Sequence, residues 1–107
     1  MNTRIYKDFY NHWHAKTTIG IGNSRELTIS TNKNSRGLLV TTATVGTFDD
    51  RGMVSHLVYQ DYCHTWLSNK KTVTEKAVSK QHQDFLDESI QDVIDDINRF
   101  YATKKVA

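Results

Sequence analysis

The sequence has no proline and only one cysteine, and these two features already narrow the class of protein. A chain without proline has no proline-rich linker and no collagen-like repeat. Cys63 stands alone, so it can form neither an internal disulfide nor a CxxC metal site. Because small secreted domains usually depend on disulfides for stability, we expect a reducing, cytoplasmic location.

Long apolar runs are also missing. The longest run of apolar residues is three, whereas a helix needs about 20 to cross a bilayer. The residues that follow Met1 are polar and aromatic and contain no apolar run of signal-peptide length. We therefore expect neither a membrane span nor a cleaved export signal, and no membrane partner.

What the sequence does contain is typical of a globular protein. Apolar residues make up 37% and charged residues 24% of the chain, a balance that argues against disorder. Its length of 107 residues predicts a single domain over residues 1–107.

Apolar and aromatic side chains recur every four residues near the N-terminus, and this spacing predicts a helix over residues 3–16. On such a helix they would form one broad face that packs in the core. The members of this face are Ile5, Tyr6, Phe9, Tyr10 and Trp13.

The middle of the chain alternates between apolar and polar residues, which predicts three or four antiparallel strands. Turn-forming residues fill 31–37 and 49–52, and they separate strands at 27–30, 38–48 and 53–64. We expect Phe48 to lie opposite Met53 in the last hairpin. With that pairing both faces of the sheet are partly apolar, so both would require cover, from the helices or from a second copy of the chain.

A long helix is predicted for the C-terminal third. Residues 72–75 match a capping box, with Thr72 as N-cap and Glu75 at the third helical position. An apolar stripe continues from Phe85 to Tyr101. The alternative is a helix broken near Gln83. The predicted fold is therefore α+β: an N-terminal helix, a three- to four-stranded antiparallel sheet, and a long or broken C-terminal helix packed on that sheet.

No catalytic, metal-binding or cofactor-binding motif is visible, so we expect a non-enzymatic protein without a cofactor. On a helix, His12 and His14 would point about 200° away from each other and could not bind one ion together, and a zinc site needs three or four convergent ligands. A further hypothesis is a small enzyme that uses Cys63 or a histidine. The simpler interpretation is that Cys63 is a small buried hydrophobic residue near a strand end.

Acidic residues crowd the C-terminal helical region. Repulsion between like charges three or four residues apart destabilises a helix, so this face is a candidate for docking on a basic surface. The chain is also polarised, with a net charge of +4 for residues 1–48 and −2 for residues 49–107. The residues predicted to bind a protein or nucleoprotein partner are Asp84, Asp87, Glu88, Asp92 and Asp95.

The leading functional hypothesis is a small cytoplasmic protein that regulates or inhibits another macromolecule, of the kind that phages and mobile elements encode. The alternative is direct nucleic-acid binding through basic residues in two parts of the chain. Homodimerisation is compatible with either hypothesis. The basic residues are Lys33, Arg36, Lys70, Lys71, Lys76 and Lys80.

Overall fold

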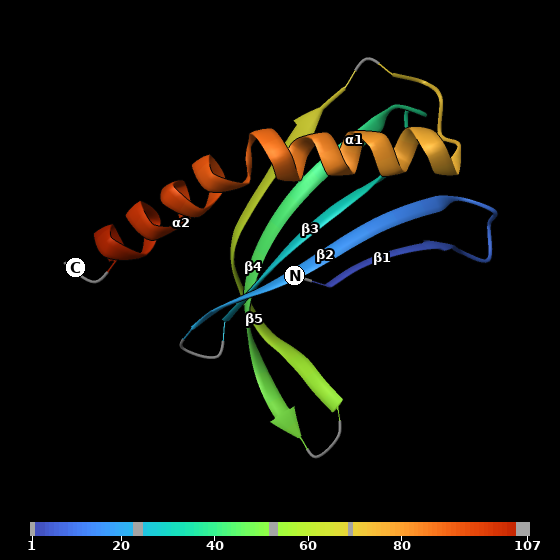
Figure 1. The fold of residues 1–107 in the computed structure, drawn as a ribbon. Helices are drawn as coiled ribbons and strands as arrows, with labels where there is room; N and C mark the ends of the chain where they lie inside the picture. The colour runs from blue at the N-terminus through green and yellow to red at the C-terminus, as the bar shows by residue number, and fades with distance from the viewer. Residues whose placement is uncertain (1, 23–24, 52–53, 69, 105–107) are drawn as a thin grey trace.

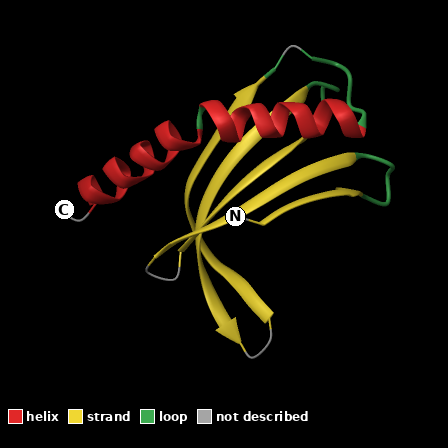
Figure 2. Cartoon of the chain, in the orientation of Figure 1, coloured by secondary structure: helices red, strands yellow, loops and turns green. Residues whose placement is uncertain are grey.

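The computed structural model describes residues 2–22, 25–51, 54–68 and 70–104. Five antiparallel strands form a meander in chain order, and two helices follow and lie across one face of it (Figures 1 and 2). The α+β class and the antiparallel sheet are confirmed, but the N-terminal helix and the strand number were predicted wrongly. The elements are β1 (Asn2–Lys7), β2 (Trp13–Gly22), β3 (Arg25–Lys33), β4 (Leu39–Arg51), β5 (Val54–Leu67), α1 (Glu75–Glu88) and α2 (Ile90–Lys104).

The segment predicted as an N-terminal helix is a β-hairpin, in which Ile5 of β1 pairs with Ala15 of β2. Its turn begins at Asp8, whose carboxylate accepts hydrogen bonds from the backbone N–H groups of Tyr10 and His12. Bonds of this kind compete with helical ones and favour turns. The four-residue aromatic spacing was misleading because Phe9, one of its members, lies fully exposed in the turn.

The β3–β4 turn occupies residues 34–38, later than predicted, and Gly37 adopts a φ of 80° there.

The predicted pairing in the last hairpin is also wrong. Phe48 pairs with Leu57, while Met53 lies outside the described residues. The predicted turn residues 49–51 belong to β4, and two register shifts, after Val45 and after Thr47, separate this pairing from the rest of the ladder. Each register shift is a β-bulge, in which one strand has an extra residue. A β-bulge increases the local twist of the sheet, and the spacing of residues in the sequence does not reveal it.

The core lies between the sheet and the helices. Strand β3 alternates as expected, so that Leu27, Ile29 and Thr31 are buried toward the helices. Apolar side chains of β4 continue this surface, and the predicted C-terminal stripe packs against it. The buried members of this cluster are Leu27, Ile29, Ala43, Val45, Leu86, Val93 and Ile97.

The opposite face of the sheet carries hydroxyl groups. Thr18, Thr28 and Thr44 lie in register across three strands, and Thr42 pairs with Thr65 of β5 at a hydroxyl–hydroxyl distance of 3.2 Å. Threonine suits a strand because it is β-branched, yet its hydroxyl remains favourable in water. The expectation that both faces of the sheet require cover stays a prediction, because the side chains of residues 47–61, which include most of the apolar residues behind it, lie outside the described part of the chain.

The C-terminal helical region is divided at Ser89, not near Gln83, and α2 leaves α1 at an angle (Figure 1). The N-cap is Thr74 rather than the predicted Thr72. Its hydroxyl accepts a hydrogen bond from the backbone N–H of Ala77 at 3.3 Å. Within the described residues, neither helix is both long and apolar enough to cross a membrane.

One polar residue of α1 is buried in this interface. His82 is 2% exposed, and its two ring nitrogens lie 2.7 Å from the hydroxyl of Thr17 and 2.8 Å from that of Thr31. A neutral imidazole donates at one nitrogen and accepts at the other, so both hydroxyls are satisfied. The Thr17 hydroxyl also forms a hydrogen bond with that of Thr3, and the Thr31 hydroxyl with that of Thr41. The network therefore extends across four strands. Burial lowers the pKa of His82.

We expect the stability of the fold to fall with acidification because of His82. In the unfolded chain His82 has a pKa near 6.5, so its ring takes up a proton below that pH. In the folded protein the lowered pKa keeps the buried ring neutral until the pH is lower still. The free energy of unfolding should therefore decrease by up to about 1.4 kcal/mol per pH unit from this group. The variant His82→Leu should be less stable at neutral pH by about 1–3 kcal/mol and should lose this part of the slope. Urea unfolding between pH 7.5 and 5 measures both quantities, and identical slopes in the two proteins would contradict the assignment.

Candidate binding surfaces

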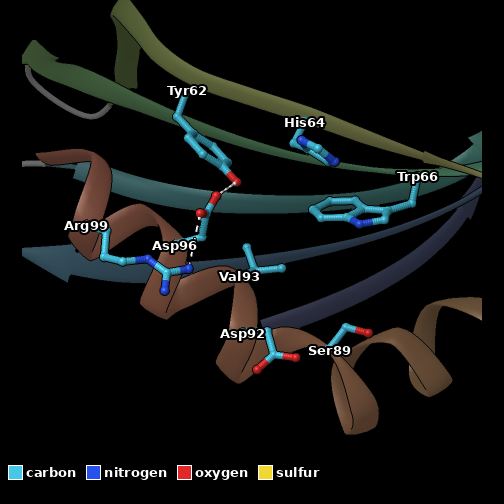
Figure 3. A pocket seen from close by; sticks show the side chains of 8 residues that line it. All are labelled: Tyr62, His64, Trp66, Ser89, Asp92, Val93, Asp96 and Arg99. Carbon is cyan, nitrogen blue, oxygen red and sulfur yellow. Dashed lines mark hydrogen bonds and ion pairs between the residues drawn. The ribbon is translucent and has the colours of Figure 1, made fainter.

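The first candidate surface lies beside β5, which is an edge strand of the sheet. Alternate side chains of β5, those of Tyr62, His64 and Trp66, project toward α2, as strand geometry requires. Between them and the helix is an open hollow of about 330 Å³ (Figure 3). Asp92 and Asp96 line its helical side, together with Ser89, Val93 and Arg99.

A second hollow of about 220 Å³ adjoins the first, with Trp66 and Ser89 lining both. Its helical side includes Asp84 and Glu88 of α1. Four carboxylates, each four residues from the next, therefore follow one side of the two hollows. We name this surface the acidic groove and define it by Asp84, Glu88, Asp92 and Asp96 on the helices and by Tyr62, His64 and Trp66 on β5.

Two of the four carboxylates are already engaged. Asp96 accepts a hydrogen bond from the Tyr62 hydroxyl at 2.9 Å and lies 3.4 Å from the guanidinium of Arg99. Burial, followed by this bond to the carboxylate, raises the pKa of Tyr62 to about 12. Asp84 pairs with Lys80 at 3.1 Å. Among the described residues, no hydrogen bond or ion pair reaches the side chain of Glu88 or Asp92.

The structure divides the predicted acidic face into two groups. Asp84, Glu88 and Asp92 line the acidic groove, whereas Asp87 and Asp95 do not and accept hydrogen bonds from Gln83 and Gln91 on their own helices. The sequence reasoning did not assign Asp96, Tyr62, His64 or Trp66 to the site. Two signals could have found them: the four-residue period of the acids, and the alternation of the three rings along one strand.

The second candidate surface is basic. The loops at residues 8–12 and 34–38 lie at the same end of the sheet, because they join β1 to β2 and β3 to β4. Strand β5 ends there too, beside the start of β4, and the backbone N–H of Leu39 donates to the carbonyl of Lys70 at 2.9 Å. The first turn of α1 begins beside these loops (Figure 1). We name this region the basic loop end; its cations are Lys33, Arg36, Lys70, Lys71 and Lys76.

Five of the six basic residues predicted for nucleic-acid binding are thus brought to one place, although they are scattered in sequence. Lys80 is the exception, because it is farther along α1 and pairs with Asp84. The described part of this end also contains two carboxylates, those of Asp8 and Glu75. Sequence spacing alone could not show the convergence, which arises because β5 ends beside the start of β4 and α1 begins near the same loops.

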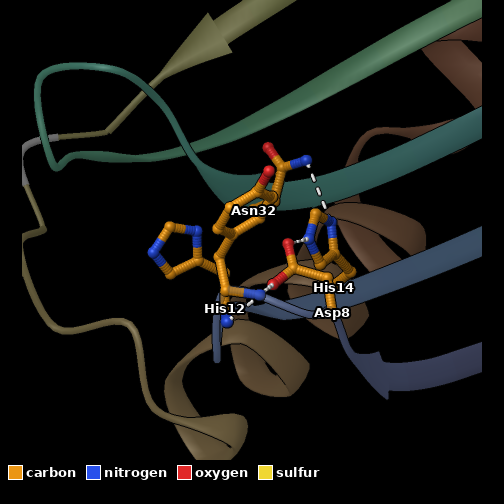
Figure 4. Close-up of polar contacts among 5 residues, drawn as sticks. Asp8, His12, His14 and Asn32 are labelled. Atoms are coloured by element: carbon orange, nitrogen blue, oxygen red, sulfur yellow. Dashed lines mark hydrogen bonds and ion pairs between the residues drawn. The ribbon is translucent and has the colours of Figure 1, made fainter.

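Two aromatic side chains, 104% and 81% exposed, project from the basic loop end: those of Phe9 and Tyr10. The turn that carries them is held by Asp8, as Figure 4 shows. One oxygen of its carboxylate accepts from two backbone N–H groups, and the other lies 2.7 Å from the ring of His14. These bonds lower the pKa of Asp8 to about 2. Asn32 contacts the far nitrogen of His14 at 3.2 Å and ties the turn to β3.

Cys63 offers little support for catalysis. It is exposed on the face of the sheet away from the helices, so its interpretation as a buried hydrophobic residue is wrong. The hydroxyl of Thr44 donates to its sulfur across a distance of 4.0 Å. His64 follows it but projects to the opposite face. In the described part of the chain, no three His, Cys, Asp or Glu side chains converge on a point where a metal ion could bind.

We expect the substitution Asp8→Ala to loosen the turn that presents Phe9 and Tyr10, because the backbone N–H groups of Tyr10 and His12 lose their acceptor. Amide hydrogen exchange should accelerate at these two residues and stay unchanged in α1, where the contacts are independent of the turn. In the unsubstituted protein, the Asp8 carboxylate should be protonated as the pH falls from its ordinary pKa of 3.8 toward about 2. This protonation should loosen the turn in the same way. Unchanged exchange at Tyr10 and His12 in the variant would contradict this role.

Comparison of the chain with known protein families, with curated proteins and with solved structures gave no significant match.

Proposed function

We propose that this protein is a non-catalytic binding protein whose acidic groove holds a basic segment of a protein or nucleoprotein partner. One observation carries the proposal: the carboxylates of Glu88 and Asp92 have no partner among the described residues and line the same hollows as the indole of Trp66. Unpaired anions beside an accessible aromatic ring suit a cationic side chain better than a neutral or anionic one.

Arginine fits this groove especially well. Its planar guanidinium donates two parallel hydrogen bonds to a carboxylate and also stacks on aromatic rings. The spacing of Glu88 and Asp92 along the helical side provides successive acceptors, while Trp66 provides a ring on the strand side. A partner with two or more basic residues could therefore engage both carboxylates at once.

Within the described part of the chain, β5 pairs only with β4, and such an edge strand favours an extended partner. An edge strand presents unpaired backbone donors and acceptors, and a peptide can add to it as a further strand. Side chains of an added strand alternate between the two faces of the sheet, so every second one would point to the side where the groove lies. A segment with alternating basic residues would combine backbone pairing with charge pairing.

An inhibitory role follows if the basic segment normally binds nucleic acid, because the groove would then compete with phosphate groups for the same cations. The predicted cytoplasmic location agrees with this role, since it places the protein among nucleoproteins. The inhibitory role and the cytoplasmic location are both parts of the proposal.

The proposal predicts that an extended peptide with alternating arginine and threonine binds the protein at low salt and changes the fluorescence of Trp66. The double variant Glu88→Gln/Asp92→Asn should bind this peptide about tenfold or more weakly, equivalent to about 1.4 kcal/mol or more. Both substitutions keep the shape of the side chain and remove its charge. Isothermal titration calorimetry and tryptophan fluorescence measure the affinity.

The matched control is Asp87→Asn/Asp95→Asn, which removes the same charge from the same helices outside the groove. It should alter affinity by less than about threefold, because exposed charges at a distance are screened. An equal loss of affinity in both double variants would indicate general attraction to an acidic helix. That result, or a wild-type protein that does not bind the peptide, would overturn the groove as the binding site.

A further inference from the structure

The exposed aromatic pair at the basic loop end is the feature that the acidic groove does not explain. Phe9 and Tyr10 are almost entirely in water, although large aromatic side chains are normally among the most buried. Their exposure is built into the turn. Backbone bonds from Asp8 to His12 at 3.0 Å and from Asn11 to Asp8 at 3.2 Å close the turn, and Asn11 adopts a φ of 62°.

The same turn is anchored to the sheet, so the two rings are presented on a defined support. The carboxylate of Asp8 and the ring of His14 join the turn to β2, and His14 also stacks on Tyr6 of β1 with ring centroids 5.0 Å apart. A support of this kind reduces the conformational entropy that is lost when a ligand binds. The arrangement resembles a prepared contact surface more than an irregular loop.

Basic residues occur in the other segments that share this end of the sheet. The five basic residues of the basic loop end come from three separate segments, and Lys7, beside the turn, lies 5.5 Å from the ring centre of Trp13. The two carboxylates at this end leave an excess of positive charge, and that of Asp8 is enclosed by hydrogen bonds. The ligand that fits should therefore be anionic and should also present flat surfaces to two rings.

We infer that the basic loop end binds single-stranded nucleic acid, with Phe9 and Tyr10 stacking on bases and the surrounding lysine and arginine side chains contacting phosphates. Single strands have both properties, since their bases are free to stack on aromatic side chains while their backbone is uniformly charged. In a duplex the bases are already stacked on one another, so duplex binding would use the cations and leave the rings without a role. This surface is separate from the acidic groove, and the inference does not depend on the proposed function.

The test measures fluorescence anisotropy of labelled oligothymidine and oligouridine of about 12 nucleotides, at about 50 mM salt and above. Phe9→Ala/Tyr10→Ala should bind about tenfold or more weakly, while the conservative pair Phe9→Tyr/Tyr10→Phe should retain wild-type affinity. Circular dichroism should show an unchanged fold in both variants, because the two side chains are exposed. Preference between the two oligomers distinguishes DNA from RNA as the natural strand.

Salt dependence tests the role of the cations. The substitution Lys70→Ala/Lys71→Ala should reduce the slope of log affinity against log salt by about 0.7 for each phosphate that the variant no longer neutralises. Lys80→Ala is the matched control, and it should leave the slope unchanged because Lys80 pairs with Asp84 away from this end. The groove variant Glu88→Gln/Asp92→Asn should bind the oligomers at least as tightly as the wild type, so failure of one proposal is distinguishable from failure of the other.

Three outcomes would overturn the inference. The first is no oligomer binding at low salt. The second is binding that does not change when Phe9 and Tyr10 become alanine, which would show attraction by charge alone. The third is self-association without nucleic acid that is lost in Phe9→Ala/Tyr10→Ala, as sedimentation velocity would show. In that case the ligand of the basic loop end is the acidic groove of a second copy.

Discussion

The placement of α1 on the sheet depends on the hydrogen bonds between His82 and two threonine hydroxyls. A buried imidazole with both nitrogens engaged tolerates little sliding or rotation of its helix, because either motion would leave a buried polar group without a partner. Apolar contacts such as those of Val78 and Leu86 stabilise the interface but specify its register less strictly. Once His82 is fixed between Thr17 and Thr31, the direction of every other side chain on α1 is fixed as well.

Both candidate surfaces follow from that placement. With α1 fixed on the sheet, Asp84 and Glu88 lie beside the edge strand β5, and the start of the helix lies beside the β1–β2 and β3–β4 loops. The division at Ser89 then lets α2 continue the acidic groove along β5. The acids could be predicted from their spacing in the sequence. The rings of β5 also show a signal in the sequence, since they alternate along one strand. Their position beside the acids and the convergence of the basic residues could not be predicted, because both depend on contacts between distant segments.

The parts of the fold that the sequence predicts correctly are those in which local pattern and burial agree. Leu27 and Ile29 alternate with polar residues and are buried on one side of β3, and the C-terminal stripe packs on the same core. The N-terminal prediction failed because a four-residue spacing suits a tight hairpin as well as a helix. The turn-forming role of Asp8 decided between them. The pairing of Phe48 failed because β4 continues through the predicted turn to Arg51, which pairs with Val54 and sets Phe48 opposite Leu57. The two bulges lie farther along the hairpin, in β5, and they also leave no trace in residue periodicity.

The order of the elements along the chain has a consequence for synthesis. The five strands precede both helices, so a growing chain on the ribosome completes its sheet while the face that holds Leu27 and Ile29 is still uncovered. Until residues 75–104 emerge, Thr17 and Thr31 have no imidazole between them and the apolar surface stays in contact with water. A transiently exposed apolar surface of this kind is prone to aggregation, and the last third of the sequence covers it once the helices form.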